Sequence, residues 1–338
     1  MTGTGSSAVA QHASACTGAE TCRGQSPTPC RGRERLPYGG GVDGEMVRRS
    51  GPREVMQAGF DALSDLYYEY WGEFFHLALF EPGSDPADLA AAYERTHQRY
   101  LELIGGGPAS RIIELACGGG AFAAWMADHT GGEVLGVDLS KGQLDRARRR
   151  LADGQRPHLR FEQRDIMELG GLDGEFDAAV CLDAACYLPD RGAALRAIAR
   201  RLRRGGRLLV VDWCRAEHTT ALQRELLLDP LCRMWAIHEL ESASGYRRKL
   251  EAAGFENIEI QDLSDRVGPN WERGYRAALR AVSEPLRPGH VVALAISAAR
   301  HGPDIVRAAK DQFTVALLAK AAADAGALRY VLACASRR

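Results

Sequence analysis

The sequence predicts an α/β fold in which a Rossmann-like, seven-stranded sheet carries helices on both faces. Two observations carry this prediction. From residue 111 onward, short apolar segments alternate with helical segments of about 10–15 residues, the order that yields parallel strands joined by crossover helices. The first apolar segment, RIIELA, also leads into three consecutive glycines at 118–120, which suit a tight turn from strand to helix.

The chain of 338 residues divides into three parts by composition. Residues 1–50 are rich in Gly, Ser, Thr and Ala without an apolar period, so we expect a disordered tail or a misassigned start. Residues 51–108 carry apolar and aromatic residues at helical spacing, which predicts N-terminal helices that cover the active site. One of them spans 85–104 with Asp85 as its cap. Residues 109–338 form the main domain.

The alternation assigns each element of the main domain a range. Strands are predicted at 111–116, 133–138, 159–165, 176–183 and 207–213. Helices are predicted at 121–129, 140–153 and 190–204. Ser140 with Gln143 three residues later is a capping-box pattern, and Gly205 stops the third helix. A strand at 255–263, a helix at 304–326 and a strand at 328–336 close the fold.

The segment at about 217–245 holds more apolar residues than one amphipathic helix needs. We therefore expect a helical lid there and a lipophilic substrate beneath it.

Composition excludes several classes of function. The net charge of −1 gives no overall field for nucleic acid or an anionic membrane, and no basic groove is visible. No apolar run approaches the roughly 20 residues of a membrane span, and the first thirty residues lack the apolar core of a signal peptide. The nine cysteines contain no CxxC pair, so we expect free thiols in a cytoplasmic protein without a metal site.

Polar side chains at the ends of the first two strands point to a nucleoside. Ligands of such sheets bind outside the carboxyl ends of the strands. Asp138, which ends the second strand, lies 24 residues after Glu114, and a carboxylate there can accept both hydroxyls of a ribose. The glycines are contiguous and preceded by an acid, unlike a dinucleotide fingerprint. This favours a nucleoside with a positive group, which Glu114 would help to place.

These motifs resemble those of the class I S-adenosylmethionine (SAM) dependent methyltransferases. IIELACGGG resembles their first motif, with Ala116 at its first glycine; GVDLS resembles the ribose-binding motif, and RDIMEL the motif whose acid, here Asp165, meets the adenine amine. The segments 176–190 and 202–213 resemble their later motifs. The resemblance implies SAM as cofactor and an antiparallel last strand. The cofactor-binding residues it implies are Glu114, Ala116, Cys117, Gly118, Gly120, Asp138, Leu139, Gln143, Asp165, Ile166 and Cys181.

A narrower resemblance, over about 58–285, is to the methyltransferases that methylate carbon in sterol side chains and to the tocopherol-type methyltransferases. It is carried by the segments FDALSDLYYEYWGEFFHLALFEPG, LDAACYLPD and VVDWCRAEH. Three departures from the pattern mean that the substrate of these enzymes cannot be assigned to this chain. Asp183 stands where sterol enzymes have Glu, Tyr187 replaces a usual His, and Phe60 replaces a frequent Tyr.

The catalytic candidates are Asp183, Trp213 and Tyr187. Asp183, at the end of the fourth strand, is placed to remove a proton, and Trp213 to wall the pocket or face a cation. A capping role for Asp183 and core packing for Trp213 are the plain structural alternatives. The substrate-pocket candidates are Tyr67, Trp71, His76, Trp235, His238 and Trp271. The cysteines at strand ends, Cys117, Cys181 and Cys214, are interpreted as small residues and not as nucleophiles.

The predicted function is SAM-dependent methylation of a lipophilic small molecule, in natural-product metabolism. C-methylation of a terpenoid or prenyl alkene or of an aromatic ring is favoured, and O- or N-methylation is the alternative. A SAM-binding cyclase or scaffold that transfers no methyl group is a second alternative. We expect neither a nucleic-acid partner nor stable membrane insertion, and a homo-oligomer is compatible with the sequence.

Overall fold

The computed structural model describes residue 68 and residues 72–151, 156–283 and 304–338. The predictions for residues 1–50, for most of 51–71, and for Tyr67 and Trp71 lie outside these residues. Among the helices described, none combines the length and the apolar character that crossing a bilayer requires.

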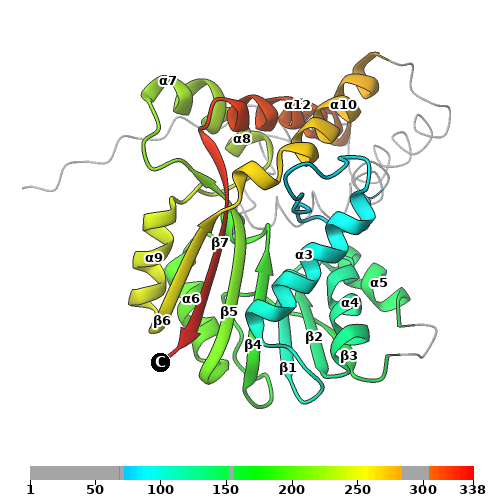
Figure 1. The fold of residues 1–338 in the computed structure, drawn as a ribbon, viewed down its shortest axis with the longest axis vertical. Helices are drawn as coiled ribbons and strands as arrows, with labels where there is room; N and C mark the ends of the chain where they lie inside the picture. The colour runs from blue at the N-terminus through cyan, green and yellow to red at the C-terminus, as the bar shows by residue number, and fades with distance from the viewer. Residues whose placement is uncertain (1–67, 69–71, 152–155, 284–303) are drawn as a thin grey trace, which may run out of the picture. The chain divides into compact units, whose positions relative to one another are not determined.

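A seven-stranded sheet, in the order β3-β2-β1-β4-β5-β7-β6, is the centre of the fold (Figure 1). Its strands are β1 (Arg111–Leu115), β2 (Glu133–Asp138), β3 (Leu159–Gln163), β4 (Phe176–Leu182), β5 (Leu202–Arg215), β6 (Phe255–Asp262) and β7 (Leu328–Arg337). Strands β1 to β5 pair in parallel, whereas β7 runs antiparallel to both β5 and β6. The predicted fold class and the antiparallel last strand are confirmed.

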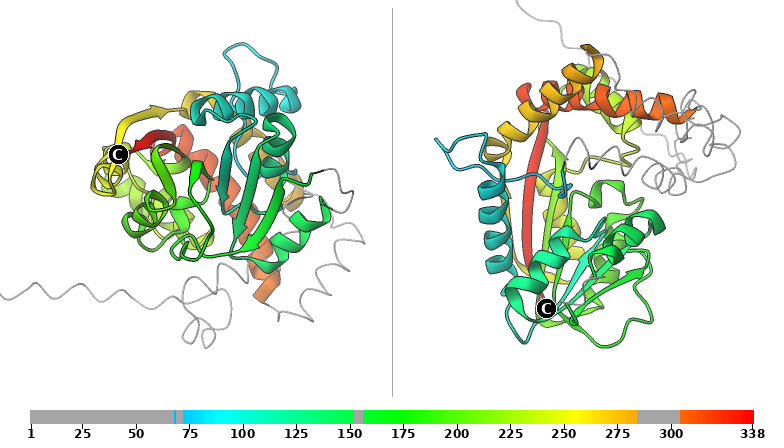
Figure 2. Two further views of the ribbon diagram at one scale, coloured as in Figure 1. Left: turned by 90° about the horizontal axis from the view of Figure 1, so that it is seen from below. Right: turned by 90° about the vertical axis from the view of Figure 1, so that its right-hand side faces the viewer.

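Two apolar cores lie on the two faces of the sheet, because successive strand residues point to opposite sides. One core joins the sheet to α3 (Leu89–Ile104), α4 (Ala121–Thr130) and α5 (Lys141–Arg149). The other joins it to α6 (Arg191–Ala199) and α9 (Ala243–Ala252). Figures 1 and 2 show α3 on the face away from α6 and α9. The prediction of helices on both faces is therefore confirmed.

Helices also gather beyond the carboxyl ends of the parallel strands. They are α7 (Ala221–Gln223), the π-helical turn η2 (Arg224–Leu228), α8 (Asp229–Met234), α10 (Gly268–Ser283) and α12 (Asp304–Asp324). Figure 1 shows this group across the top of the sheet, next to the end of β5 and the start of β7. The short helices η1 (Ala185–Tyr187) and η3 (Ser264–Arg266) complete the described elements.

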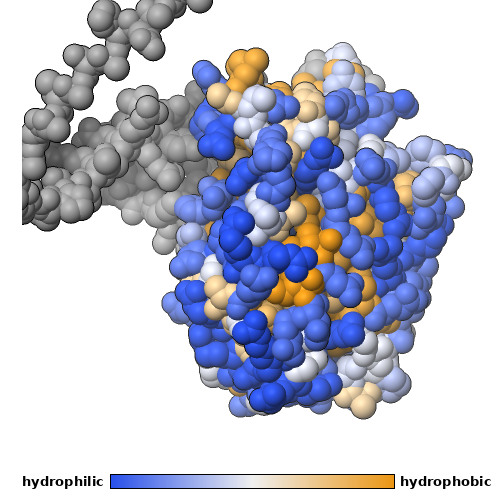
Figure 3. Space-filling view, turned by 60° about the vertical axis from the view of Figure 1, so that its left-hand side comes forward, coloured by the Kyte–Doolittle hydropathy of each residue, from blue (hydrophilic) through white to orange (hydrophobic). Residues whose placement is uncertain are grey.

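The segment expected to be a helical lid, 217–245, is helical only over 221–234 and at the start of α9. Residues 235–242 form an irregular segment between these helices. Leu222 and Leu226 keep 65% and 57% of their surface exposed, whereas Leu231 is fully buried. Apolar surface is visible at the upper end of the face in Figure 3, amid largely hydrophilic surroundings.

Two local predictions were wrong, and a third was confirmed only in part. Helix α3 is capped by Asp88, whose side chain accepts from the Ala91 N–H, while Asp85 bonds the Ala87 N–H in the preceding turn. Helix α6 ends at Ala199, not at residue 204, because Leu202 already pairs with Phe176 in the β4–β5 ladder. Sheet pairing there prevails over the helix propensity of an arginine-rich segment.

The third concerns the capping box at α5. The Ser140 side chain does accept from the Gln143 N–H. The Gln143 side chain, however, accepts from the Tyr68 hydroxyl, and the Ser140 N–H donates to Asp138.

Tyr68 is helical, whereas the next described part of the N-terminal aromatic segment, residues 72–80, is not. Residues 72–80 form an irregular stretch, and all five residues from His76 to Phe80 are buried. The Ala78 N–H donates to the Asn270 side chain and the Leu79 N–H to Thr96. These bonds fasten the stretch to α10 and α3, so it becomes one wall of the site described next.

Candidate active site

The turn after β1 brings backbone N–H groups to the carboxyl edge of the sheet. Ala116 has φ 55° and Gly118 has φ 52°, both in the left-handed region that favours glycine. Gly120, at φ 72°, caps α4, and a Cβ there would lie 2.5 Å from the Phe161 ring. The turn therefore requires glycine at position 120, where α4, the sheet and the Phe161 ring meet.

Asp138 faces this turn from the end of β2. Its Oδ2 accepts from the Gly118 N–H at 2.9 Å and its Oδ1 from the Ser140 N–H at 2.8 Å. The Gly119 N–H donates to the Tyr68 hydroxyl at 2.8 Å. The bonds from Gly118 and Ser140 orient the Asp138 carboxylate at this edge of the sheet.

Glu114 is a buried carboxyl in the middle of this region. Its side chain is 5% exposed, and its Oε2 has no hydrogen-bond partner among the described residues. Burial raises the pKa of Glu114 to about 8, and a bond from the Ala123 N–H offsets only part of that effect. A cation set against Oε2 would restore the ionised form.

The other predicted cofactor residues lie around the same edge. The Gln163 side chain donates to the Leu139 carbonyl, and the Arg164 N–H to the Asp138 carbonyl, so the ends of β2 and β3 are joined. Asp165 accepts from the Met167 N–H at 2.8 Å. Gln143, Ile166, Cys117 and Cys181 are buried. Burial raises the pKa of the thiols of Cys117, Cys181 and Cys214, which argues against a nucleophilic role.

Asp183 is the second carboxyl of the site and directly follows β4. Its φ of 50° is left-handed, a conformation that aspartate tolerates better than most residues. Its Oδ1 accepts from the Tyr330 hydroxyl at 2.6 Å and its Oδ2 from the Trp213 indole N–H at 3.1 Å. The Tyr330 oxygen in turn accepts from the Leu77 N–H at 3.2 Å. Strands β4, β5 and β7 and the stretch 72–80 all converge on this side chain.

The charge of Asp183 is controlled by its surroundings. Burial raises its pKa well above the usual range, and the nearby Asp212 carboxylate raises it further. The bonds from Tyr330 and Trp213 lower it, by a smaller amount than burial raises it. Asp183 thus has the electrostatics of a proton acceptor whose basicity is increased.

Three tryptophans pack beside Asp183. The ring of Trp213 lies 4.3 Å from that of Trp235 and 5.0 Å from that of Trp271, the second at an interplanar angle of 80°. They border a cavity of about 30 Å³, roughly the room of one water molecule. Its other lining residues are Phe74, Phe75, His76, Leu77, Leu89, Tyr93, Asn270 and Arg273. The exposed Arg273 brings a positive charge to an otherwise mostly aromatic surface.

His76 forms part of this cavity as a neutral side chain. Its Nε2 lies 2.8 Å from Nε2 of His97, so one ring donates to the other. Burial lowers the pKa of His76 to about 3 and that of His97 to about 2. The pair sits among aromatic rings. In this environment His76 lines the cavity and does not act as an acid or base.

The structure brings together three of the predicted pocket residues: His76, Trp235 and Trp271. The prediction for His238 was wrong: its side chain is exposed, and its N–H donates to the Cys186 carbonyl at 3.0 Å. Tyr187 is partly buried and packs against the core on the α3 face.

Sequence reasoning missed Tyr330, which bonds Asp183 directly. Tyr330 pairs with Trp213 in the β5–β7 ladder. The available signal was a lone tyrosine in a strand of otherwise small and apolar residues, LRYVLACAS.

Comparisons with known proteins agree with this geometry. A family model described as a methyltransferase domain matches residues 112–206. The chain is 30% identical over 218 residues to Methyltransferase GfsG of Streptomyces halstedii, an alignment covering 64% of this chain and 74% of the relative. It is 30% identical over 226 residues to 27-O-demethylrifamycin SV methyltransferase of Amycolatopsis mediterranei, covering 66% of this chain and 80% of the relative. It is 25% identical over 236 residues to the chloroplastic tocopherol O-methyltransferase of Arabidopsis thaliana, covering 65% and 68%.

Solved structures share the fold. The [4+2]-cyclase SpnF matches with a TM-score of 0.67 and 21% identity, over 85% of this chain and 97% of that one. Geranyl diphosphate methyltransferase, solved with its substrate and sinefungin, matches with a TM-score of 0.62 and 18% identity, over 86% and 100%. At these identities the likeness concerns the fold alone.

Proposed function

Because this chain belongs to the SAM-dependent methyltransferase family, we propose that it transfers the methyl group of SAM to a hydroxyl oxygen of a lipophilic natural product. The observation that carries the proposal is Asp183, a carboxyl of raised pKa that accepts hydrogen bonds from Tyr330 and from Trp213, and Trp213 lines a cavity together with two other tryptophans. By their names, one relative is a tocopherol O-methyltransferase and another acts on 27-O-demethylrifamycin SV, which supports oxygen as the acceptor.

The residues at the β1–β2 edge fit SAM. Oε2 of buried Glu114 has no hydrogen-bond partner in the part of the chain that the structure describes, so it suits the ammonium group of the cofactor. The Asp138 carboxylate suits the ribose hydroxyls. Asp165, after β3, is proposed to accept from the adenine amine, as the resemblance implies. SAM supplies a methyl group that its sulfonium has already activated. The protein therefore has to align an acceptor and exclude water.

Asp183 is proposed as the general base. A carboxylate with a raised pKa takes a proton from a hydroxyl more readily than an ordinary exposed one. Tyr330 and Trp213 fix its orientation, since each donates to a different oxygen. The tryptophan cluster excludes water from the same point. Arg273 disfavours an ammonium acceptor by charge repulsion, which argues against amine methylation.

C-methylation of an alkene, favoured from the sequence, is the second candidate. The three tryptophans beside Asp183 support it, because indole faces stabilise a carbocation. Trp213, however, is only 6% exposed and contacts Trp235 and Trp271, so little of its ring is free to meet a substrate. This packing favours the oxygen acceptor.

The test is a product analysis with SAM whose methyl group carries deuterium. Phenols, secondary alcohols, prenyl alkenes and amines of similar size are offered in parallel, and products are identified by mass spectrometry and NMR. We expect the label on oxygen. Label on carbon would replace the proposal by the second candidate. SAM binding without any labelled product across the panel would favour a cyclase or scaffold instead.

A further inference from the structure

Two connecting segments, one of which contains η1, meet beside Trp235, a lining residue of the cavity. Residues 184–190 follow Asp183, and residues 235–242 begin with Trp235. The His238 N–H donates to the Cys186 carbonyl at 3.0 Å, so the segments run side by side. Whatever fixes their separation also fixes the distance between the proposed base and one wall of the cavity.

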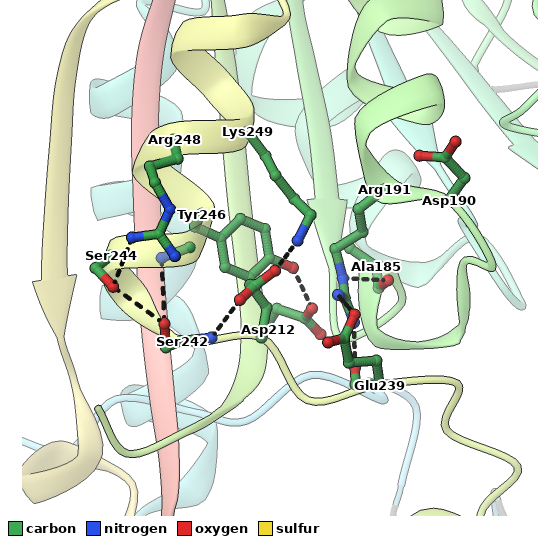
Figure 4. A network of polar contacts seen from close by, with 12 residues as sticks. Ala185, Asp190, Arg191, Asp212, Glu239, Ser242, Ser244, Tyr246, Arg248 and Lys249 are labelled. Atoms are coloured by element: carbon green, nitrogen blue, oxygen red, sulfur yellow. Dashed lines mark hydrogen bonds and ion pairs between the residues drawn. The ribbon is translucent and has the colours of Figure 1, made fainter. Parts of the chain in front are cut away.

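Arg191, the first residue of α6, bonds both segments at once. Its Nε donates to the Ala185 carbonyl at 2.9 Å, and one terminal nitrogen donates to the Glu239 carbonyl. Its other terminal nitrogen lies 3.6 Å from the Glu239 carboxylate. Figure 4 shows the guanidinium between Ala185 and Glu239. At 3% exposure, Arg191 is a buried cation committed to backbone carbonyls.

A buried acid, Asp212, adds an electrostatic attraction for the Arg191 guanidinium. Asp212, on β5, is 1% exposed, accepts from the Tyr246 hydroxyl, and leaves Oδ1 without a hydrogen-bond partner among the described residues. The Arg191 guanidinium lies 5.7 Å from the Tyr246 ring centroid. Figure 4 shows Asp212, Tyr246 and Arg191 together on the α6–α9 side of the sheet. Asp212 immediately precedes Trp213, so this network lies directly behind the donor to Asp183.

We propose that Arg191 is a positioning residue that fastens the Trp235 segment to the Asp183 loop and so sets the geometry of methyl transfer. The inference rests on the proposed function. A planar guanidinium bonds two carbonyls in fixed directions, whereas a lysine ammonium supplies the charge but not the fork. Arg191 is not among the described residues that line the cavity.

Arg191→Lys is the test, with Glu239→Gln as the matched control, because the control removes a side-chain carboxylate but leaves the Glu239 carbonyl. We expect Arg191→Lys to lower kcat about tenfold or more and to leave affinity for S-adenosylhomocysteine within about twofold. Glu239→Gln should stay within about twofold in both. Amide exchange at His238 and Glu239 should accelerate in Arg191→Lys only. Turnover and amide exchange equal to those of the unchanged protein would overturn the proposal, as would equal losses of cofactor affinity and kcat.

A second measurement needs no variant. In the unchanged protein, the His238 amide should exchange about a hundredfold more slowly than a free amide, because the clamp holds its bond to Cys186. If the His238 amide exchanges as fast as a free amide, the proposal that Arg191 holds the two segments together is overturned, even if Arg191→Lys does not fold. If no acceptor is methylated, the proposed function fails. The amide-exchange measurements still show whether Arg191 holds the two segments together.

Discussion

Two carboxyls at neighbouring strand ends, the buried Glu114 and the half-buried Asp183, are prepared for different tasks. Burial raises the pKa of both. Glu114 sits within regular β1 and leaves one oxygen without a partner among the described residues. Asp183 has a left-handed backbone, and side chains donate to both of its oxygens. The first carboxyl is incomplete until a cation binds it, whereas the second is already oriented.

The difference separates binding from chemistry. A site that lacks one partner gains most when the ligand supplies it, so the Glu114 side should govern cofactor affinity. A group held by fixed donors loses little order during reaction, so the Asp183 side should govern turnover. Substitutions on the two sides should therefore act on different constants.

The largest effect is expected from Asp183→Asn. The amide cannot take a proton, so kcat should fall by roughly 10²-fold or more while affinity for S-adenosylhomocysteine stays unchanged. With a phenol acceptor, raising the pH should restore part of the rate, because the phenol then loses its proton to solvent. The measurement is kcat against pH, with calorimetry for the cofactor product. If Asp183→Asn weakened affinity for S-adenosylhomocysteine as much as it lowered kcat, the Asp183 side would not act on turnover alone.

Asp138→Ala should act on the other side. Two hydrogen bonds to a charged acceptor are lost, which costs roughly 2–3 kcal/mol, or about a 30- to 150-fold weaker affinity for S-adenosylhomocysteine. At saturating SAM, kcat should change much less. Asp145→Ala is a matched control, since Asp145 lies on the exposed side of α5 and pairs with Lys141. Unchanged affinity in Asp138→Ala would exclude Asp138 from the cofactor site.

The same two sides differ in how far the sequence could predict them. Glu114, the glycine turn and Asp138 belong to consecutive strands, and their spacing alone indicated a nucleoside edge. Around Asp183, the partners come from distant segments: Tyr330 lies 147 residues away and Trp213 lies 30. Register between β5 and β7 brings them together, and local periodicity does not encode that register. His238 was misplaced for the same reason, because its backbone, not its ring, makes the contact with Cys186.

Glu114 should make cofactor binding depend on pH. Its pKa of about 8 means that near pH 6 the free protein holds it protonated, whereas a bound ammonium requires the carboxylate. Affinity should therefore rise as pH increases from 6 toward 8, by up to about tenfold per pH unit, with release of a proton. In Glu114→Gln this pH dependence should disappear. Calorimetry in buffers of different ionisation enthalpy measures the proton, and an unchanged pH dependence in the variant would assign it elsewhere.

Glu114→Gln also tests the same pKa without ligand. A carboxyl whose pKa rises from 4.5 unfolded to about 8 folded binds a proton on folding between these values, so stability from this group falls as pH rises through that window. The variant should therefore gain melting temperature relative to the unchanged protein at pH 8 and little or nothing at pH 4. A constant difference across this range would contradict the raised pKa.

The smallest effect is expected from Trp213→Phe and Trp213→Leu, and it decides the acceptor. If oxygen is methylated, no carbocation forms, and Trp213 serves as a wall and as a donor to Asp183. Both variants lose the indole N–H, so each should lose a similar, modest part of kcat, about 3- to 20-fold. If an alkene is methylated, the aromatic face lowers the barrier; Phe should then retain most of the rate and Leu should fall well below it. The ratio of the two variants, measured at one pH with the same acceptor, separates the cases because the hydrogen bond is absent from both. A ratio near one supports the oxygen acceptor, and a ratio of about tenfold or more in favour of Phe would assign a cation-stabilising role to the tryptophan side.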